Sequence, residues 1–208
     1  FSSNKAVCVG AITDEKNDKI YSLIADGTWF VSGTSTSTAD YIAVKSDYIL
    51  EYNVAEALID PPYKFVFNDI YEVETQTNSS SDNANKDYLH IKANIGIRDG
   101  MIATFQTADG INHNIKVRHL FENDSSSTTY DAGTSGVQVF LDKAFTGTVS
   151  DNTTVTFKSE KRVLNFSRDN IITGINVIDD FLFWTDNKNE PKRLNIKRSL
   201  AGTGGTTH

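Results

Sequence analysis

Apolar and polar residues alternate with period two over most of the chain. The alternation is clearest in residues 111–119, 137–141 and 154–158. Successive side chains of a strand point to opposite faces of a sheet, so this pattern predicts half-buried β-strands. Asp-Gly, Asn-Asp and Ser/Thr clusters separate the strands, and Asp109-Gly110 predicts a hairpin turn. We therefore predict an all-β fold.

Few segments depart from this pattern. Only residues 53–59 have a helical composition, and Pro61 and Pro62 stop the segment, so a short helix and a loop are equally compatible with it. The polar stretches 32–40, 78–86 and 122–129 lack apolar residues that could anchor them. We expect these three stretches to be exposed loops.

A weak internal repeat relates the two ends of the chain. Residues 11–26 and 174–186 each form an apolar strand, a tight polar turn and an aromatic-bearing strand that ends in Asp. Further strands, 47–53 and 192–197, follow the two copies. One such unit cannot bury both faces of its sheet, whereas units packed side by side can, as in the blades of a β-propeller. The repeat predicts about two blades.

The region between the two copies differs from them in composition and in its alternation of apolar and polar residues. Residues 71–160 contain neither Trp nor Pro and alternate regularly, and a structureless insertion of that length would be unusual in a compact domain. We predict that residues 1–70 and 161–208 form a discontinuous β-propeller segment of about two blades. Residues 71–160 would be an inserted β-sandwich or barrel-like domain, flanked by propeller strands at 64–68 and 163–167.

The second copy carries a family resemblance. Residues 181–186 read Phe-Leu-Phe-Trp-Thr-Asp and, with the strand 193–197, resemble the YWTD type of β-propeller repeat. In such blades the Trp packs between neighbouring blades and the Asp bonds loop backbone. The resemblance implies these roles for Trp184 and Asp186. The first copy has no Trp and a longer loop.

A wider segment points to a class of particle. Residues 164–196 are similar to large virion structural proteins of tailed phages, namely nozzle, muzzle or DNA-stabilisation components. The resemblance implies a non-enzymatic structural protein in the tail region of a virion. Its partners would be other virion proteins and copies of itself in a homo-oligomer, with possible proximity to a DNA channel and no small-molecule substrate.

Composition narrows the function further. The chain has 208 residues with 20 basic and 27 acidic side chains, and a net charge of −7 argues against a general nucleic-acid binder. The lone Cys8 excludes an intrachain disulfide framework and a Cys-rich zinc site. No apolar run approaches the ~18–20 residues of a spanning helix. Because the sequence starts at Phe1 without a signal-peptide pattern, we interpret it as a piece of a longer protein.

Three histidines invite a metal-site hypothesis. His113 and His119 fall on one predicted strand six residues apart, which corresponds to about 20 Å, too far for them to share a metal ion. We predict that His90, His113 and His119 are partly exposed strand residues. No metal ligand and no cofactor-binding residue is assigned.

Acidic residues occur in groups that could suit hydrolysis. Asp14-Glu15 and Asp179-Asp180 occupy equivalent turns of the two repeats, and Asp69 stands near Glu72 and Glu74. A turn role explains the first two pairs because Asp tolerates tight-turn backbone angles and bonds its own backbone. No catalytic residue is assigned.

Basic residues concentrate near the end of the chain. Residues 161–208 carry eight basic and five acidic side chains, and five of the basic ones gather around one strand, namely Lys188, Lys192, Arg193, Lys197 and Arg198. They could protect the edge of that strand from pairing. They could instead dock to an acidic subunit or line a DNA channel.

Three function classes remain. The leading one is a structural phage component that acts through subunit contacts. The second is a module that binds a host-surface glycan or protein, with Trp29, Tyr41 and Tyr130 as expected contacts. The third is a propeller glycoside hydrolase with a cleft of acidic residues.

Overall fold

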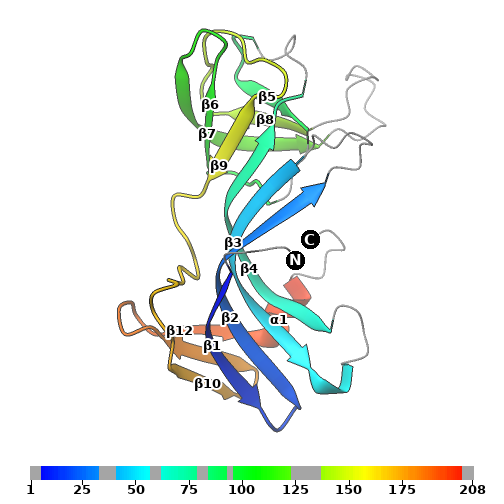
Figure 1. The fold of residues 1–208 in the computed structure, drawn as a ribbon, viewed down its shortest axis with the longest axis vertical. Helices are drawn as coiled ribbons and strands as arrows, with labels where there is room; N and C mark the ends of the chain where they lie inside the picture. Colours follow the sequence, from blue (N-terminus) through cyan, green and yellow to red (C-terminus); the bar gives the residue numbers. More distant parts are fainter. Residues whose placement is uncertain are drawn as a thin grey trace.

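The structure is an elongated β-protein with two ends joined by long strands. The computed structural model describes residues 6–32, 41–56, 62–78, 84–92, 96–122 and 137–202. Figure 1 shows β5 to β9 at one end and β10, β12 and α1 at the other, with β3 and β4 running between them. The predicted loops 32–40, 78–86 and 122–129 fall largely outside the described residues.

The prediction of an all-β fold is confirmed. The long strands of the first part are β1 (Val7–Asp14), β2 (Lys19–Ser32), β3 (Tyr41–Asn53) and β4 (Tyr63–Gln76). The middle part contains β5 (Tyr88–Ile91), β6 (Ile102–Gln106), β7 (Asn112–Glu122), β8 (Val137–Leu141) and β9 (Thr154–Lys158). The last part contains β10 (Gly174–Ile178), β11 (Phe181–Thr185), β12 (Lys192–Asn195) and α1 (Ile196–Gly202).

The described strands form two antiparallel sheets. Nine strands pair in the order β1-β2-β3-β4-β9-β6-β7-β8-β5, and β10-β11-β12 make a separate three-stranded sheet. Neither sheet closes, and the arrangement does not by itself show a propeller. An isolated bridge between Thr77 and Ile91 brings the end of β5 beside the continuation of β4.

Two hydrophobic cores lie along the long axis, and β3 and β4 contribute to both. The first core gathers Val44 and Val73 with residues of the middle part, namely Leu89, Ile91, Ile97, Met101, Ala103, Phe105, Ile115, Val117, Val139, Leu141, Phe145, Val149, Val155 and Phe157. The second core gathers Val9, Tyr21, Leu23, Ala25, Ile49, Val66, Leu164, Phe166, Ile172, Leu182, Trp184 and Ile196. The predicted domain boundary between residues 70 and 71 falls inside β4, which continues through it without a break. The division into two domains stays a prediction.

The local turn chemistry agrees with the sequence. β6 and β7 pair antiparallel from Ile102 and Lys116 to Gln106 and Asn112, on either side of the predicted Asp109-Gly110 turn. Gly110 has a φ of 84°, in the left-handed region that glycine adopts without steric cost. The hairpin prediction is confirmed.

One predicted strand is absent and another is shorter than predicted. Residues 163–167 have no strand conformation, because the N–H groups of Leu164 and Phe166 donate to carboxylates rather than to a neighbouring strand. The predicted strand 192–197 ends at Asn195, whose Oδ1 accepts a 2.8 Å bond from the Arg198 N–H. This bond caps the N-terminus of α1, a helix that the sequence interpretation missed.

The segment 53–59, for which a helix and a loop were both open, contains a short 3₁₀ helix at Val54–Glu56. Its last three residues lie outside the described part of the chain.

The two copies of the repeat pack against each other in the second core. Tyr21 of β2 and Trp184 of β11 both belong to that core, and Trp184 is only 6% exposed. Its ring meets the ring of Phe166 edge-on at a centroid distance of 6.2 Å. The segment before β10 also joins the large sheet directly, since the Ile172 N–H donates to the Val9 carbonyl at 2.7 Å.

The change Trp184→Ala should lower the free energy of unfolding by about 3–5 kcal/mol, because it empties a buried site between the two sheets. Denaturant melts measure this loss. The control is Phe183→Ala, which truncates a half-buried ring on the opposite face of the same strand and should cost less. A loss below about 1 kcal/mol for Trp184→Ala would contradict the packing described.

Candidate functional site

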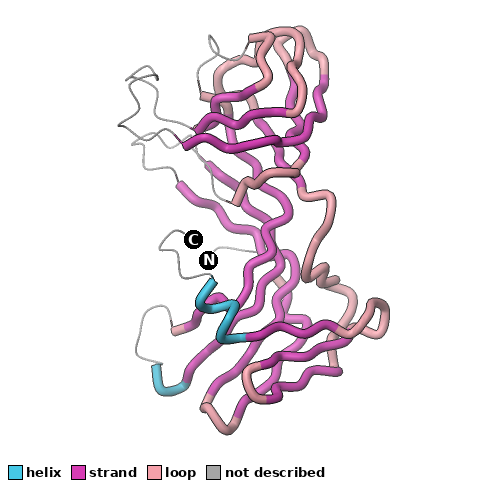
Figure 2. Tube along the Cα trace, turned by 180° about the vertical axis from the view of Figure 1, so that it is seen from behind, coloured by secondary structure: helices cyan, strands magenta, loops and turns pink. Residues whose placement is uncertain are grey.

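A charged junction lies between the two cores. Residues 159–173, here called the linker, run along the outside of the molecule from β9 to β10 (Figure 1 and Figure 2). Within the linker, Nη2 of Arg162 lies 2.6 and 2.5 Å from the two carboxylate oxygens of Asp47 on β3. The same nitrogen donates to the Phe166 carbonyl at 3.2 Å. The guanidinium group stacks over Tyr71 of β4, 4.0 Å from the ring centroid.

Asp47 is the buried centre of this junction. Its side chain has no exposed surface, and its oxygens also accept bonds from the N–H groups of Asp26, at 3.1 Å, and Phe166, at 2.9 Å. Burial raises the pKa of Asp47, and the bond from Arg162 opposes that shift. Burial alone would lower the pKa of Arg162, but Asp47 outweighs it and raises that pKa.

A second carboxylate holds the linker from β4. Asp69 is 1% exposed, and its Oδ2 accepts the Leu164 N–H at 2.8 Å. Its Oδ1 lies 3.7 Å from Nη2 of Arg98. The adjacent strands β3 and β4 therefore hold the linker backbone through side-chain carboxylates, where a neighbouring strand would use backbone hydrogen bonds. We call Asp26, Asp47, Asp69, Tyr71 and Arg162 the junction.

Asp26 connects the junction to an open pocket. Its Oδ1 accepts the Tyr71 hydroxyl at 2.8 Å and lies 3.5 Å from Nη2 of Arg162. It has a φ of 53°, a left-handed conformation that Asp tolerates better than most residues. This conformation falls within the register shift between β2 and β3.

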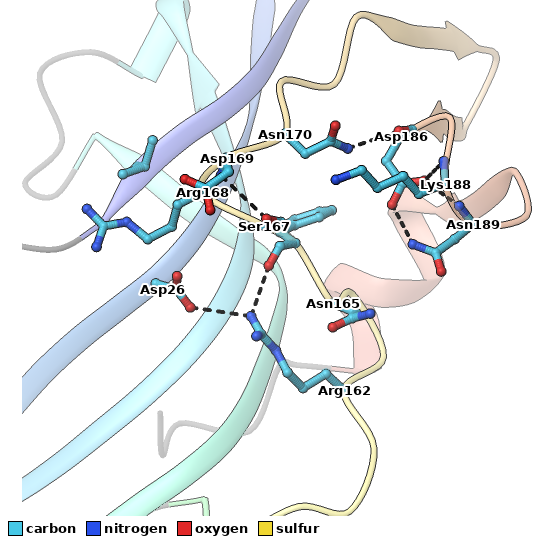
Figure 3. A pocket seen from close by; sticks show the side chains of 12 residues that line it. Asp26, Arg162, Asn165, Ser167, Arg168, Asp169, Asn170, Asp186, Lys188 and Asn189 are labelled. Carbon is cyan, nitrogen blue, oxygen red and sulfur yellow. Dashed lines mark hydrogen bonds and ion pairs between the residues drawn. The ribbon is translucent and has the colours of Figure 1, made fainter.

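The pocket has a volume of about 590 Å³ and a mostly polar lining (Figure 3). It is lined by Val7, Asp26, Arg162, Asn165, Phe166, Ser167, Arg168, Asp169, Asn170, Asp186, Lys188 and Asn189. Its walls come from the linker and from the loop after β11. The Asn170 side chain joins these two walls by donating to the Asp186 carbonyl at 2.9 Å. Such a lining offers hydrogen bonds and charges to a polar ligand.

Asp186 has a structural role in the pocket wall. Its Oδ1 accepts the N–H groups of Asn189, at 2.7 Å, and Lys188, at 3.0 Å, and its Oδ2 accepts the Asn189 side chain at 2.6 Å. These bonds, led by that from the Asn189 backbone, lower the pKa of Asp186 to about 2. The carboxylate thus fixes the loop after β11, as the resemblance of 181–186 to YWTD repeats implies.

The histidines lie apart from the junction. His113 and His119 share β7, and His113 stacks on Phe105 at a centroid distance of 5.2 Å. The prediction of partial exposure is wrong for His90, which is 4% exposed on β5. Among the described residues, no group of three or more His, Cys, Asp or Glu side chains could hold a metal ion.

The predicted acidic groups occupy turns and a strand. Asp14 borders the turn between β1 and β2 and accepts the Asn17 side chain at 2.7 Å. Asp179 has a φ of 52° in the two-residue turn between β10 and β11. On β4, Glu72 pairs with Lys45 and Lys158, at 2.5 and 3.2 Å. Burial opposes this, yet the two ammonium groups lower the pKa of Glu72.

The basic residues near the end of the chain have different partners. Nζ of Lys192 donates to the carbonyl groups of Val163, at 2.9 Å, and Leu164, at 2.6 Å, and so ties β12 to the linker. Lys197 pairs with Asp180 at 3.0 Å. The Arg193 guanidinium lies over the Phe181 ring, 5.9 Å from its centroid.

The aromatic contacts expected for a binding module cannot be placed. The side chains of Trp29 and Tyr41, and the whole of Tyr130, lie outside the described part of the structure.

The sequence interpretation missed Asp47 and Arg162 and did not recognise the role of Asp69. A signal was present, since Asp47 and Asp69 interrupt apolar and aromatic strands, where a buried charge needs a partner.

Comparison with known proteins finds no family model, no curated protein and no solved structure that matches the chain. None of the described helices is long and apolar enough to cross a membrane.

The change Arg162→Met should lower the free energy of unfolding by about 2–4 kcal/mol, because it leaves the Asp47 carboxylate buried without its cation. The control Lys116→Met removes a 3.4 Å ion pair with Glu160 in which both side chains are exposed, 44% and 60%, and it should cost less than about 1 kcal/mol. Chemical denaturation of both variants measures the difference. Equal losses would contradict a special role for Arg162.

The loop after β11 should loosen in acid. The pKa of Asp186 is lower in the fold than its ordinary value, so its contribution is present above about pH 4 and is lost as the pH falls through about 2. Exchange of the Lys188 and Asn189 amide protons, followed by NMR, should accelerate over that range. Asp186→Ala should remove this pH dependence, and the control Asp169→Ala, in the same pocket, should keep it. A loop equally ordered in Asp186→Ala would refute the assignment.

Proposed function

We propose that the chain is a non-enzymatic structural component of a phage particle, of the tail-nozzle type, and that it acts through contacts between subunits. In this proposal β10–β12 and the adjoining part of β1–β4 are neighbouring blades of a partial β-propeller. Residues 71–160 are then an inserted sandwich or barrel-like module. The resemblance of residues 164–196 to virion structural proteins supports the phage assignment.

The observation that carries the proposal is a cluster of three apolar side chains on the outer face of the three-stranded sheet. Leu182 and Trp184 of β11 point into the second core, so Phe181 and Phe183 point to the opposite face. Ile178, the cross-strand partner of Phe181, is 53% exposed. The rings of Phe181 and Phe183 lie 6.1 Å apart, both half-buried. These three apolar side chains share the face with the polar residues Asn176, Arg193 and Asn195, and an exposed apolar cluster with a polar border suits a contact with a neighbouring subunit.

The acidic residues near the pocket support a structural role. The Asp47 carboxylate accepts bonds from the linker, and that of Asp186 accepts bonds from its own loop. Asp26 accepts a bond from Tyr71. Each of these carboxylates therefore contributes to the architecture of the fold.

A second candidate function is recognition of a host-surface glycan, and the pocket favours it. Arg168 and Lys188 line the pocket, and among the described residues neither side-chain charge has a hydrogen-bond or ion-pair partner. Asn165 and Ser167 add amide and hydroxyl groups to the same lining. Hydroxyl and carboxylate groups of a saccharide match this set of donors and acceptors.

Sedimentation and electron microscopy test the structural proposal. The chain should associate into oligomers, and Phe181→Ser combined with Phe183→Ser should weaken association, because the contact energy comes from apolar burial. The control is Val54→Ser, which removes an apolar side chain 54% exposed at a different site. Equal weakening by both changes would argue against the outer face.

A monomeric chain that hydrolyses a polysaccharide would overturn the structural proposal. A glycan array separates the second candidate, because binding that is lost in Arg168→Ala together with Lys188→Ala would favour the pocket as a glycan site.

A further inference from the structure

β10 leaves one edge of the three-stranded sheet open. Among the described strands it pairs only with β11, and the pairing ends at Ile178 and Phe181 on either side of a two-residue turn. In a hairpin with a two-residue turn, the residues that flank the turn exchange both backbone hydrogen bonds. The bonded positions on β10 are therefore Ile178, Asn176 and Gly174.

The remaining positions of β10 direct their backbone groups away from β11. The alternation of an antiparallel ladder places the N–H and C=O groups of Ile175 and Val177 at the open edge. No hydrogen bond joins these four groups to any described residue. β10 therefore presents two donors and two acceptors in a row.

The other sheet edges near β10 are either covered by hydrogen bonds or protected by charged side chains. The Val9 carbonyl of β1 accepts the Ile172 N–H, and the Val66 carbonyl of β4 accepts the Ser199 hydroxyl at 2.5 Å, from α1. β12 carries Lys192 and Arg193, charges of the kind that discourage edge pairing. β10 reads Gly-Ile-Asn-Val-Ile and has no charged residue. Such an edge is a template for another strand.

We propose that β10 pairs antiparallel with β10 of a second copy of this chain, about a two-fold axis at Asn176. This register sets Ile175 opposite Val177 of the second copy, and the reverse. These are the positions whose backbone groups are open, so two hydrogen-bonded pairs form with four new bonds. Asn176 faces its own counterpart as a non-hydrogen-bonded pair. The three-stranded sheets of two copies then become one six-stranded sheet.

The side chains of β10 are complementary to themselves in this register. On the face toward the second core, Ile175 meets Val177, two β-branched residues that pack well across strands. On the outer face, Ile178 meets Gly174, which has no side chain of its own to clash with it. A side chain that is 53% exposed in the single chain thus gains a neighbour. The self-match favours a second copy over an unrelated strand.

The inference rests on the proposed assembly function and names its partner. Cysteine cross-linking tests it, in a Cys8→Ser background because Cys8 is exposed. Asn176→Cys should give a disulfide-linked dimer under mild oxidation, since the Cα atoms of a non-hydrogen-bonded pair lie about 4.5 Å apart. The control is Ile178→Cys on the same face. Its two copies would be four residues out of register, about 13 Å along the strand, and should not cross-link.

A second variant removes two of the backbone hydrogen bonds between the copies and leaves the β10–β11 ladder of each chain intact. Val177→Pro deletes an N–H group that faces away from β11, and an edge position of this kind tolerates proline. Two hydrogen bonds per dimer are lost, so the dimer dissociation constant in sedimentation should rise about ten- to hundredfold. The control Val177→Ala removes most of the side chain but keeps the N–H, and it should preserve more of the association. Thermal melts check that both variants remain folded.

The outcomes separate this inference from the broader proposal. Oligomers that cross-link equally through positions 176 and 178, or that are unaffected by Val177→Pro, would overturn the β10 register and leave assembly through another surface standing. A chain that stays monomeric at high concentration would overturn both.

Discussion

The ion pair between Arg162 and Asp47 is the constraint on which the rest of this structure depends. Asp47 is wholly buried on β3, and a buried carboxylate is costly unless it is paired and hydrogen-bonded. Arg162 supplies the charge, and the N–H groups of Asp26 and Phe166 supply the bonds. Because these donors come from β2 and from the linker, satisfying one carboxylate fixes the position of three segments.

The fixed position of these segments determines how the two ends of the molecule are placed relative to each other. β3 and β4 continue from one hydrophobic core to the other, and apolar burial alone would hold each core separately. The linker returns along the outside and delivers Leu164 and Phe166 to the second core, next to Trp184. Among the described residues, no backbone hydrogen bond joins residues 160–166 of the linker to a strand, so Asp47 and Asp69 take the place of a ladder there. A buried ion pair adds little net stability compared with well-packed apolar residues, whereas removing one partner leaves a costly unpaired charge.

The sequence was sufficient for the strands and insufficient for the junction. Period-two alternation identified β7, β8 and β9 because each has one face in the first core. The same alternation misled at residues 163–167, where the apolar residues are buried without strand pairing. The helix α1 was missed because it has only seven residues, and one apolar pair four residues apart, Ile196 and Leu200, is too short a pattern to indicate a helix. The capping residue Asn195 was the one available signal. Arg162 and Asp47 are 115 positions apart, and no local pattern relates them.

Hydrogen exchange of the Leu164 and Phe166 amides tests the central claim most directly. If buried carboxylates hold the linker in place of a strand ladder, both amides should be protected nearly as strongly as the core strand β9. The neighbouring Asn165 amide, for which the structure gives no such carboxylate bond, should exchange faster. Leu164 and Phe166 amides that exchange at the rate of open loops, while β9 stays protected, would contradict the account.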